Sequence, residues 1–256
     1  MIILLYFLIF FIGLCLGSFL NVLLVRLDKK EGIITGRSEC PKCLQQLKWY
    51  DLIPLISYII LRGKCRYCRS VISPIYPITE LVTALVVTLY FWSSGFYLGP
   101  SDIFAVFVLV SMIALLFFDA LYLILPDKIV FMLSGTALIY GIFFKKPELI
   151  NLLVSGFLFG SFFAILYIVS RGKWMGFGDV KLAFAIGLIL GYPLGFFAII
   201  LAIWTAALVG VVMIVLKKAS LKTALPFGSF MAGSTIIFII FKNVIETKFS
   251  FVSNFF

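Results

Sequence analysis

Four of the five cysteines in this 256-residue chain form two Cys-x-x-Cys pairs. The pairs are Cys40-Pro-Lys-Cys43 and Cys65-Arg-Tyr-Cys68. Two pairs at this spacing are typical of a tetrahedral zinc site in which each pair contributes two thiolates from a tight turn. Because all four ligand positions are then filled, we expect the zinc to be structural and to stabilise a module too small to build its own core.

Two other interpretations of these cysteines are open. They could form two disulfides, which a cytoplasmic position disfavours because thiols there stay reduced. They could also include a redox-active Cys-x-x-Cys, but two matched pairs favour metal. Cys15 lies within an apolar run, and we interpret it as a packing residue.

Asp119 lies in the apolar run Leu-Leu-Phe-Phe-Asp-Ala-Leu-Tyr of residues 115–122. A carboxylate within or beside a membrane span is costly, so its presence indicates a function. The structural alternative is a side chain that reaches towards the lipid headgroups.

Asp179 follows Gly176-Phe177-Gly178 at the expected start of another span. The two glycines would allow close helix approach and a locally unwound backbone. A dinucleotide site is excluded because no third glycine and no βαβ unit accompany them. Asp179 could simply cap a helix, but we expect it at the same membrane depth as Asp119. Two converging carboxylates predict an aspartic dyad that activates water for peptide hydrolysis.

Three further charged residues accompany these motifs. Asp127 competes with Asp119 as a partner of Asp179, but its position before a predicted helix favours capping. Glu80 suits the N-terminal part of a helix and is otherwise a candidate contact for a substrate or cofactor. Lys181 either anchors the cytoplasmic end of a span or holds a nearby carboxylate.

The chain contains no histidine, and 63% of its residues are hydrophobic while 12% are charged. A soluble domain carries about 25% charged residues, so this composition indicates a protein of the lipid bilayer. The absence of histidine excludes Ser-His-Asp and Cys-His catalysis, His-ligated zinc and imidazole proton relays. Proton transfer must therefore depend on other side chains, and the carboxylates are the best candidates.

Membrane helices must position these residues. The apolar runs predict an all-α polytopic membrane protein with about eight transmembrane helices, near 2–25, 77–95, 102–121, 128–144, 150–170, 180–192, 194–216 and 225–242. The breaker Gly191-Tyr192-Pro193 could mark a hairpin or a kink in one long helix, which would give seven spans. The first run lacks a basic stretch and a small-residue cleavage site, so we expect a retained helix and not a signal peptide.

The loops divide the chain into three parts: a first helix at 1–25, a cytoplasmic insert at 26–76 that carries the cysteine pairs, and a membrane core at 77–256. Loops on the side of the insert hold 17 of the 21 Lys and Arg residues. The positive-inside rule therefore places the insert in the cytoplasm and both termini outside. The net charge of +10 is then a topology signal with an affinity for anionic membrane lipid, and nucleic-acid binding is not expected.

A series of short motifs runs through nearly the whole chain. The first are Gly-Ser-Phe-Leu-Asn-Val at 17–22, Arg26-Leu27, both cysteine pairs, Trp-Tyr-Asp-Leu-Ile-Pro at 49–54, Leu-Arg-Gly-Lys at 61–64, Ile72-Ser73, Tyr76-Pro77 and Glu80. Then follow Asp119 with Leu-Pro-Asp at 125–127, Met-Gly-Phe-Gly-Asp-Val-Lys-Leu at 175–182 and Pro-Phe-Gly at 226–228. Together they resemble the type IV prepilin peptidases, a family of GxGD-type membrane aspartic proteases. Asp28, where the family often has proline, and the apolar stretch after Asp119 depart from the pattern without removing a catalytic group.

The resemblance implies an enzyme that cleaves the basic leader of type IV prepilins and pseudopilins, after a glycine, at the cytoplasmic face of the bacterial inner membrane. It implies Asp119 and Asp179 as the catalytic pair, with Gly176, Gly178 and Lys181 in the active-site loop. Family members with the four-cysteine insert typically also methylate the new N-terminal amine with S-adenosylmethionine. The resemblance implies a role in type IV pili, protein secretion or DNA uptake.

Two functions of other classes compete with this interpretation. A proton-coupled transporter would use Asp119 and Asp179 as relay groups, but it leaves the cysteine pairs unexplained, and no inverted repeat is evident. A membrane-anchored zinc adaptor that only binds partners leaves the intramembrane carboxylates unexplained.

Overall fold

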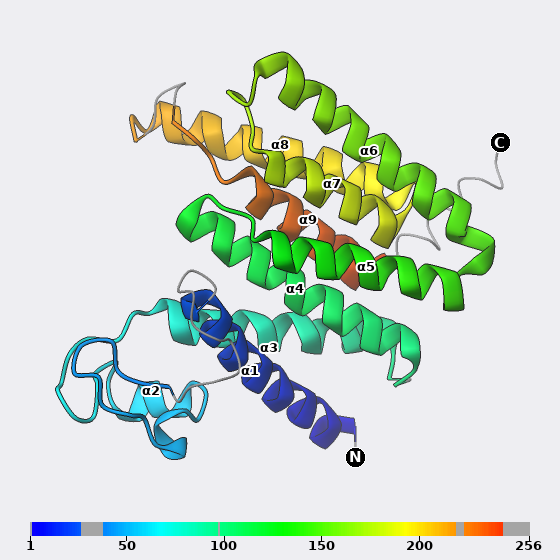
Figure 1. Ribbon diagram of the computed structural model, residues 1–256. Helices are drawn as coiled ribbons and strands as arrows, with labels where there is room; N and C mark the ends of the chain where they lie inside the picture. Colours follow the sequence, from blue (N-terminus) through cyan, green and yellow to red (C-terminus); the bar gives the residue numbers. More distant parts are fainter. Residues whose placement is uncertain (1, 27–37, 97, 219–222, 243–256) are drawn as a thin grey trace. The chain divides into compact units, whose positions relative to one another are not determined.

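The computed structural model describes residues 2–26, 38–96, 98–218 and 223–242 (Figure 1). Parts of the predicted insert (27–37) and of the predicted core (97, 219–222 and 243–256) lie outside the described residues. The described residues form helices and two isolated β-bridges, without a strand. The helices are α1 (Ile2–Arg26), η1 (Trp49–Asp51), α2 (Ile56–Ile60), α3 (Ile75–Ser94), α4 (Pro100–Tyr122), α5 (Asp127–Phe144), η2 (Lys146–Glu148), α6 (Leu149–Ser170), α7 (Phe177–Leu190), α8 (Leu194–Val215) and α9 (Phe227–Ile240). The predicted all-α fold class is confirmed.

Six helical segments are long and apolar enough to cross a membrane: α1, α3, α4, α5, the segment Lys146–Ser170 that contains α6, and α8. The helices α7 and α9 have 14 residues each. At 1.5 Å per residue each is about 21 Å long, less than the roughly 30 Å of a bilayer's hydrocarbon core. A helix therefore occupies each of the eight predicted ranges, and length separates six candidate spans from two short helices.

The breaker at Gly191-Tyr192-Pro193 separates two helices. The helix α7 ends at Leu190 and α8 begins at Leu194. The two helices contact each other and run back alongside one another (Figure 1). The breaker is therefore a hairpin turn and not a kink in one long helix.

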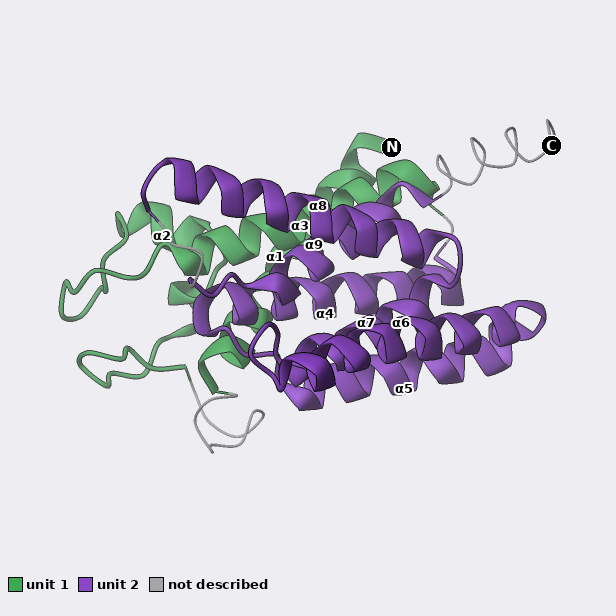
Figure 2. Ribbon diagram, turned by 90° about the horizontal axis from the view of Figure 1, so that it is seen from above, with its two compact units in different colours: residues 1–97 green, residues 98–256 purple. Residues whose placement is uncertain are grey.

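The chain divides into two compact units, residues 1–97 and 98–256 (Figure 2). This division follows packing, so the three functional parts expected from the sequence remain a prediction. In unit 1, α1 packs closely along α3. A Cβ atom at Gly17 would lie 2.6 Å from the Cα atom of Glu80, and one at Gly13 would lie 2.6 Å from the Cα atom of Ala84. Only glycine permits this backbone approach, which is a common device of membrane helix pairs.

Polar side chains also join α1 to α3. The buried Asn21 donates its amide N–H to the carbonyl oxygen of Tyr76 at 3.0 Å. The buried Thr79 hydroxyl donates to the Asn21 side-chain oxygen. Because buried polar groups must find partners in a membrane protein, these bonds fix the register of the two helices.

Unit 2 has the two short helices at its centre. The helix α7 packs against α5, α6 and α9, and α9 packs against α4 and α8 as well. Eight of the 14 residues of each short helix are buried, whereas the longer α8 has six buried residues out of 22. A helix that is apolar on all sides belongs in the interior. The short helices are therefore inner elements, and their N-terminal turns carry the residues described next.

Candidate active site and metal centre

The two aspartates singled out from the sequence lie in unit 2 on different helices. Asp119 is in the last turn of α4 and Asp179 is in the first turn of α7. The two residues are only 6% and 8% exposed, respectively. The Leu125 side chain adjoins both Gly228, which lies next to the Asp119 carboxyl group, and Gly178, which directly precedes Asp179. The fold therefore brings together two acidic groups that are 60 residues apart in the sequence.

Ser229, at the start of α9, holds the Asp119 side chain. Its backbone N–H donates to Asp119 Oδ2 at 2.6 Å, and its hydroxyl lies 3.1 Å from the same oxygen. The same hydroxyl lies 3.0 Å from the carbonyl oxygen of Leu116, one turn earlier in α4. The first N–H groups of a helix have no partner within the helix and suit an acidic acceptor. Ser229 was missed in the sequence, where its one signal is that it directly follows the Pro-Phe-Gly motif.

Asp179 is the third residue of α7, and Gly176 is the N-cap. The backbone N–H of Gly176 donates to Asp179 Oδ2 at 3.3 Å. The capping alternative is thus partly right, because the carboxylate bonds back to the residue that begins the helix. This bond engages one carboxylate oxygen and orients the side chain.

Leu125 packs against glycines on both inner helices. Ideal Cβ atoms at Gly178 and Gly228 would lie 3.1 Å and 2.9 Å, respectively, from atoms of the Leu125 side chain. The Cβ atom at Gly228 would also lie 3.1 Å from the carboxyl carbon of Asp119. Gly228 therefore lets the start of α9 approach Asp119 closely enough for the Ser229 hydrogen bonds.

Asp127 and Lys181 form a salt bridge of 2.6 Å between α5 and α7. The N-cap of α5 is Pro126, and Asp127 makes no capping bond through its side chain. The expectation that Asp127 caps the helix is therefore wrong, because its carboxylate turns to a cation on the neighbouring helix. Of the two roles considered for Lys181, the structure shows the one of holding a carboxylate. The ammonium also lies 5.0 Å from the ring of Phe177.

The two cysteine pairs of unit 1 form turns with the same hydrogen bonds. Cys40 N–H donates to the carbonyl of residue 45, and Cys65 N–H donates to that of residue 70. The carbonyls of the same two cysteines accept from the residues four positions on, Leu44 and Arg69. Those two residues share a left-handed backbone, with φ of 57° and 59°. Each turn is closed by one antiparallel bridge, Glu39 to Gln46 and Lys64 to Val71. The pairs are therefore two copies of one knuckle.

The four sulfur atoms are gathered as a zinc ion requires. All lie within 4.8 Å of one another, and the Cys40 and Cys68 sulfurs are 3.9 Å apart. Zinc–sulfur bonds of about 2.3 Å in a tetrahedron give sulfur–sulfur distances of about 3.8 Å. All four cysteines are free thiols in the structure. The Ser70 hydroxyl, 3.1 Å from the Cys68 sulfur, lowers the pKa of that thiol and favours the thiolate that binds metal. The donor set fits a structural zinc ion.

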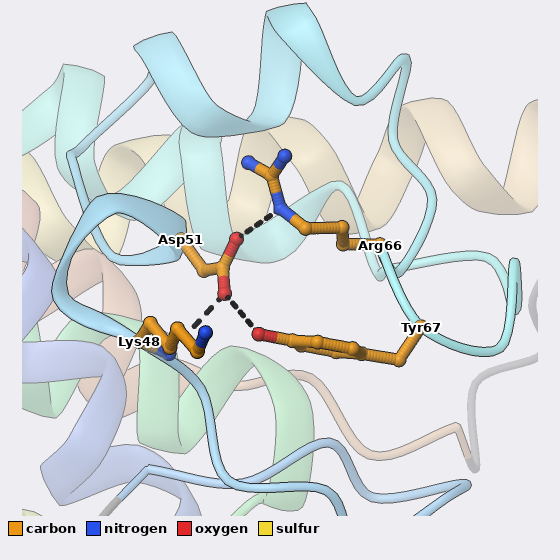
Figure 3. A network of polar contacts seen from close by, with 4 residues as sticks. All are labelled: Lys48, Asp51, Arg66 and Tyr67. Atoms are coloured by element: carbon orange, nitrogen blue, oxygen red, sulfur yellow. Dashed lines mark hydrogen bonds and ion pairs between the residues drawn. The ribbon is translucent and has the colours of Figure 1, made fainter.

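Asp51 connects the segment between the knuckles to the second knuckle (Figure 3). Its carboxylate receives the Arg66 guanidinium at 2.7 Å, the Tyr67 hydroxyl at 3.1 Å and the backbone N–H of Lys48 at 3.2 Å. Burial alone would raise the pKa of Asp51, but the bonds from Arg66, Lys48 and Tyr67 outweigh it and hold the pKa below its usual value. The side chain is 3% exposed, so this carboxylate is a buried structural anchor.

Glu80 is buried at the interface of α1 and α3. Its Oε2 accepts the backbone N–H of Leu55, at the start of α2, at 2.9 Å. No Lys or Arg pairs with Glu80 among the residues that the structure describes. Glu80 therefore anchors the insert to α3 while remaining a buried acid without a cationic partner.

The chain is similar to known families over most of its length. Residues 11–94 match the bacterial peptidase A24 N-terminal domain, and residues 106–211 match the type IV leader peptidase family. A Pseudomonas aeruginosa protein named prepilin leader peptidase/N-methyltransferase is 31% identical, over 86% of this chain and 85% of that protein. Proteins of the same name from Myxococcus xanthus (35% identical, 80% of this chain and 62% of that protein) and Bacillus subtilis (30%, 90% and 91%) are also similar. No solved structure matches.

Proposed function

The chain belongs to the type IV leader peptidase family, and from this premise we propose that it is a membrane endopeptidase that cleaves the leader of type IV prepilins and pseudopilins and N-methylates the new N-terminus. Relatives named for both activities cover most of the chain. The observation that carries the peptidase assignment is the buried pair of Asp119 and Asp179 in a chain that has no histidine.

The mechanism that we propose uses one carboxylate of the pair as a general base and the other as a general acid. The base takes a proton from water, and the water oxygen attacks the scissile carbonyl carbon. The acid donates a hydrogen bond to the carbonyl oxygen. When the tetrahedral intermediate collapses, the carbon–nitrogen bond breaks and the leaving amine takes a proton from the pair. Ser229 and Gly176 each hold one carboxylate oxygen, so each aspartate keeps a second oxygen for this chemistry.

The residues around Asp179 support this geometry. Gly176 positions the Asp179 carboxylate, and Gly178 leaves room for Leu125. Lys181 is paired with Asp127, so we assign it the positioning of α5 against α7 and not a contact with the scissile bond.

The cytoplasmic side of the inner membrane is the side where we place the cleavage. The Lys and Arg distribution supports this orientation. A prepilin is itself an apolar helix with a basic leader, so it can lie among the spans while its leader reaches the aqueous face. Substrates of type IV pili and of protein secretion both have this form.

We place the methyl-transfer contact at Glu80 in unit 1. The buried carboxylate has neutral donors, the backbone N–H of Leu55 and the Ser18 side chain, and no described cation, and an unpaired buried charge is costly. The sulfonium of bound S-adenosylmethionine would place a positive charge beside this carboxylate, and the bound molecule would supply the methyl group for the new N-terminal amine.

The affinities for S-adenosylmethionine and for S-adenosylhomocysteine, measured separately, distinguish this assignment from a purely structural role of Glu80. We expect Glu80→Gln to weaken S-adenosylmethionine binding about tenfold or more and to leave S-adenosylhomocysteine binding unchanged, because the latter has no charge at sulfur. Glu39→Gln, at an exposed acid of the insert, is the control. Equal losses for both nucleosides would show that Glu80 only maintains the fold.

Incubation of the purified protein with a prepilin tests the proposed function as a whole. A shortened product is expected, and added S-adenosylmethionine should increase its mass by one methyl group. A transporter or a zinc adaptor would leave the precursor intact. For the four-cysteine cluster we propose a structural zinc ion, which metal analysis of the same sample measures.

A further inference from the structure

The short helix α2 presents an apolar face to the outside of the insert. Ile56, Ile59 and Ile60 are 50%, 70% and 69% exposed. They are spaced i, i+3 and i+4, so they lie on one side of the helix. Ser57 and Tyr58, on the other side, are less exposed. Three neighbouring exposed isoleucines form an apolar patch, a feature that commonly marks a contact with a protein or a membrane.

An exposed tryptophan accompanies this face. Trp49, in η1 seven residues before α2, is 78% exposed and contacts Tyr50 edge to face. Tryptophan is enriched where protein meets the headgroup region of a bilayer, because its ring is apolar and its N–H is polar. We call Trp49 together with Ile56, Ile59 and Ile60 the insert face.

The charges of the insert favour an anionic partner. All six basic residues between 38 and 74 are exposed: Lys42, Lys48, Arg62, Lys64, Arg66 and Arg69. The acids in the same segment are Glu39 and Asp51, and Asp51 is already paired with Arg66. A tetrathiolate zinc centre would add two negative charges, which still leaves the segment positive. Basic residues beside an apolar face are typical of segments that lie on anionic membranes.

The connections of the insert keep it near the bilayer. It begins after α1 and ends at α3, and both helices are candidate membrane spans. A module tethered at both ends by spans has a lipid surface within reach and loses little freedom by lying on it.

We propose that the insert face lies in the headgroup region of the bilayer and that the exposed Lys and Arg side chains of the same segment bind anionic lipid. This contact orients the zinc module relative to the membrane plane. It is independent of both catalytic assignments, because no residue of the insert face belongs to either site.

The fluorescence of Trp49 tests this proposal in the intact protein. Trp92→Phe, Trp174→Phe and Trp204→Phe together leave Trp49 as the single tryptophan. The protein is placed in nanodiscs that contain brominated lipids, with either phosphatidylglycerol or phosphatidylcholine headgroups. We expect blue-shifted emission that the bromine atoms quench, more strongly with phosphatidylglycerol. Emission typical of water without quenching in either lipid would overturn the proposal.

Two substitutions locate the contact. Ile59→Glu with Ile60→Glu should abolish most of the quenching, because it puts charges on the insert face. Val71→Glu changes an equally exposed residue of the second knuckle, outside this face, and should leave the quenching unchanged. Zinc content, measured for every variant, shows that the module is folded. Two results would contradict the proposal. One is quenching that survives the double substitution, and the other is quenching that is lost when a prepilin substrate is added.

Discussion

The carboxylate of Asp51 in unit 1 and those of Asp119 and Asp179 in unit 2 are all withdrawn from water, but their partners differ. Asp51 receives a guanidinium and two further donors. Asp119 has the two donors of Ser229, and Asp179 has one backbone N–H. Within the described residues neither pairs with Lys or Arg. A buried acid with its own cation stabilises a fold, whereas acids held only by neutral donors remain available for proton transfer.

The largest expected effect on cleavage comes from substitution of Asp119 or Asp179, the two aspartates without a described Lys or Arg partner. Asp119→Asn and Asp179→Asn should each reduce prepilin cleavage by about 10²–10⁴-fold, the contribution of general acid–base catalysis. Because the two carboxylates act as one unit, the double variant should be little worse than either single variant. Cleavage kinetics measure this, with the thermal unfolding of each variant as the check on folding. Additive losses would mean that the residues act separately.

Substitution of Asp51 should reduce the stability of the zinc module and not the rate of cleavage. Asp51→Asn removes an ion pair whose Arg66 partner is partly exposed, so we expect the release of zinc to a chelator to become faster by at most about fivefold. Cleavage should stay near the wild-type rate. A loss of cleavage with normal zinc retention would contradict the distinction between a structural aspartate in unit 1 and catalytic aspartates in unit 2.

The pH dependence of the Asp51 effect has a definite sign. Because the folded-state pKa is below the ordinary value of 3.8, the stabilisation is complete above that value and is lost as the pH falls through the folded-state pKa. The difference in zinc release between wild type and Asp51→Asn should therefore be constant from about pH 6 to about pH 8. A difference that changes within this range would assign the effect to another group.

Ser229 should have an intermediate effect on cleavage. Ser229→Ala removes the hydroxyl bond to Asp119 and keeps the backbone bond, so we expect about a fivefold decrease, equivalent to roughly 1 kcal/mol. Ser229→Thr keeps a hydroxyl and should restore most of the rate. If both variants have wild-type rates, Ser229 does not position Asp119.

Asp127 should show the smallest effect. Its pair with Lys181 is exposed on the Asp127 side, and exposed salt bridges contribute about 0–1 kcal/mol. Asp127→Asn should therefore change the cleavage rate by less than about fivefold. A loss as large as that of Asp119→Asn would make Asp127 the partner of Asp179 and contradict the proposed pair.

The sequence alone predicted the features that depend on residues close together in the chain. The spacing of the cysteines predicted their cluster, and apolar runs predicted a helix in each of eight ranges. Contacts over long distances could not be predicted. Ser229 reaches Asp119 across 110 residues, and Lys181 reaches Asp127 across 54. The short α7 and α9 are predictable as helices, but their central position depends on the packing of the longer helices around them.

Cleavage and methylation can be measured separately, because we assign hydrolysis to unit 2 and methyl transfer to unit 1. Asp119→Asn is given S-adenosylmethionine with either the full prepilin or a pilin whose leader has already been removed, and the products are weighed. We expect an intact, unmethylated prepilin in the first case and a methylated pilin in the second. Cleavage of the prepilin by this variant at a rate near that of the wild type would show that Asp119 is not part of the hydrolytic site.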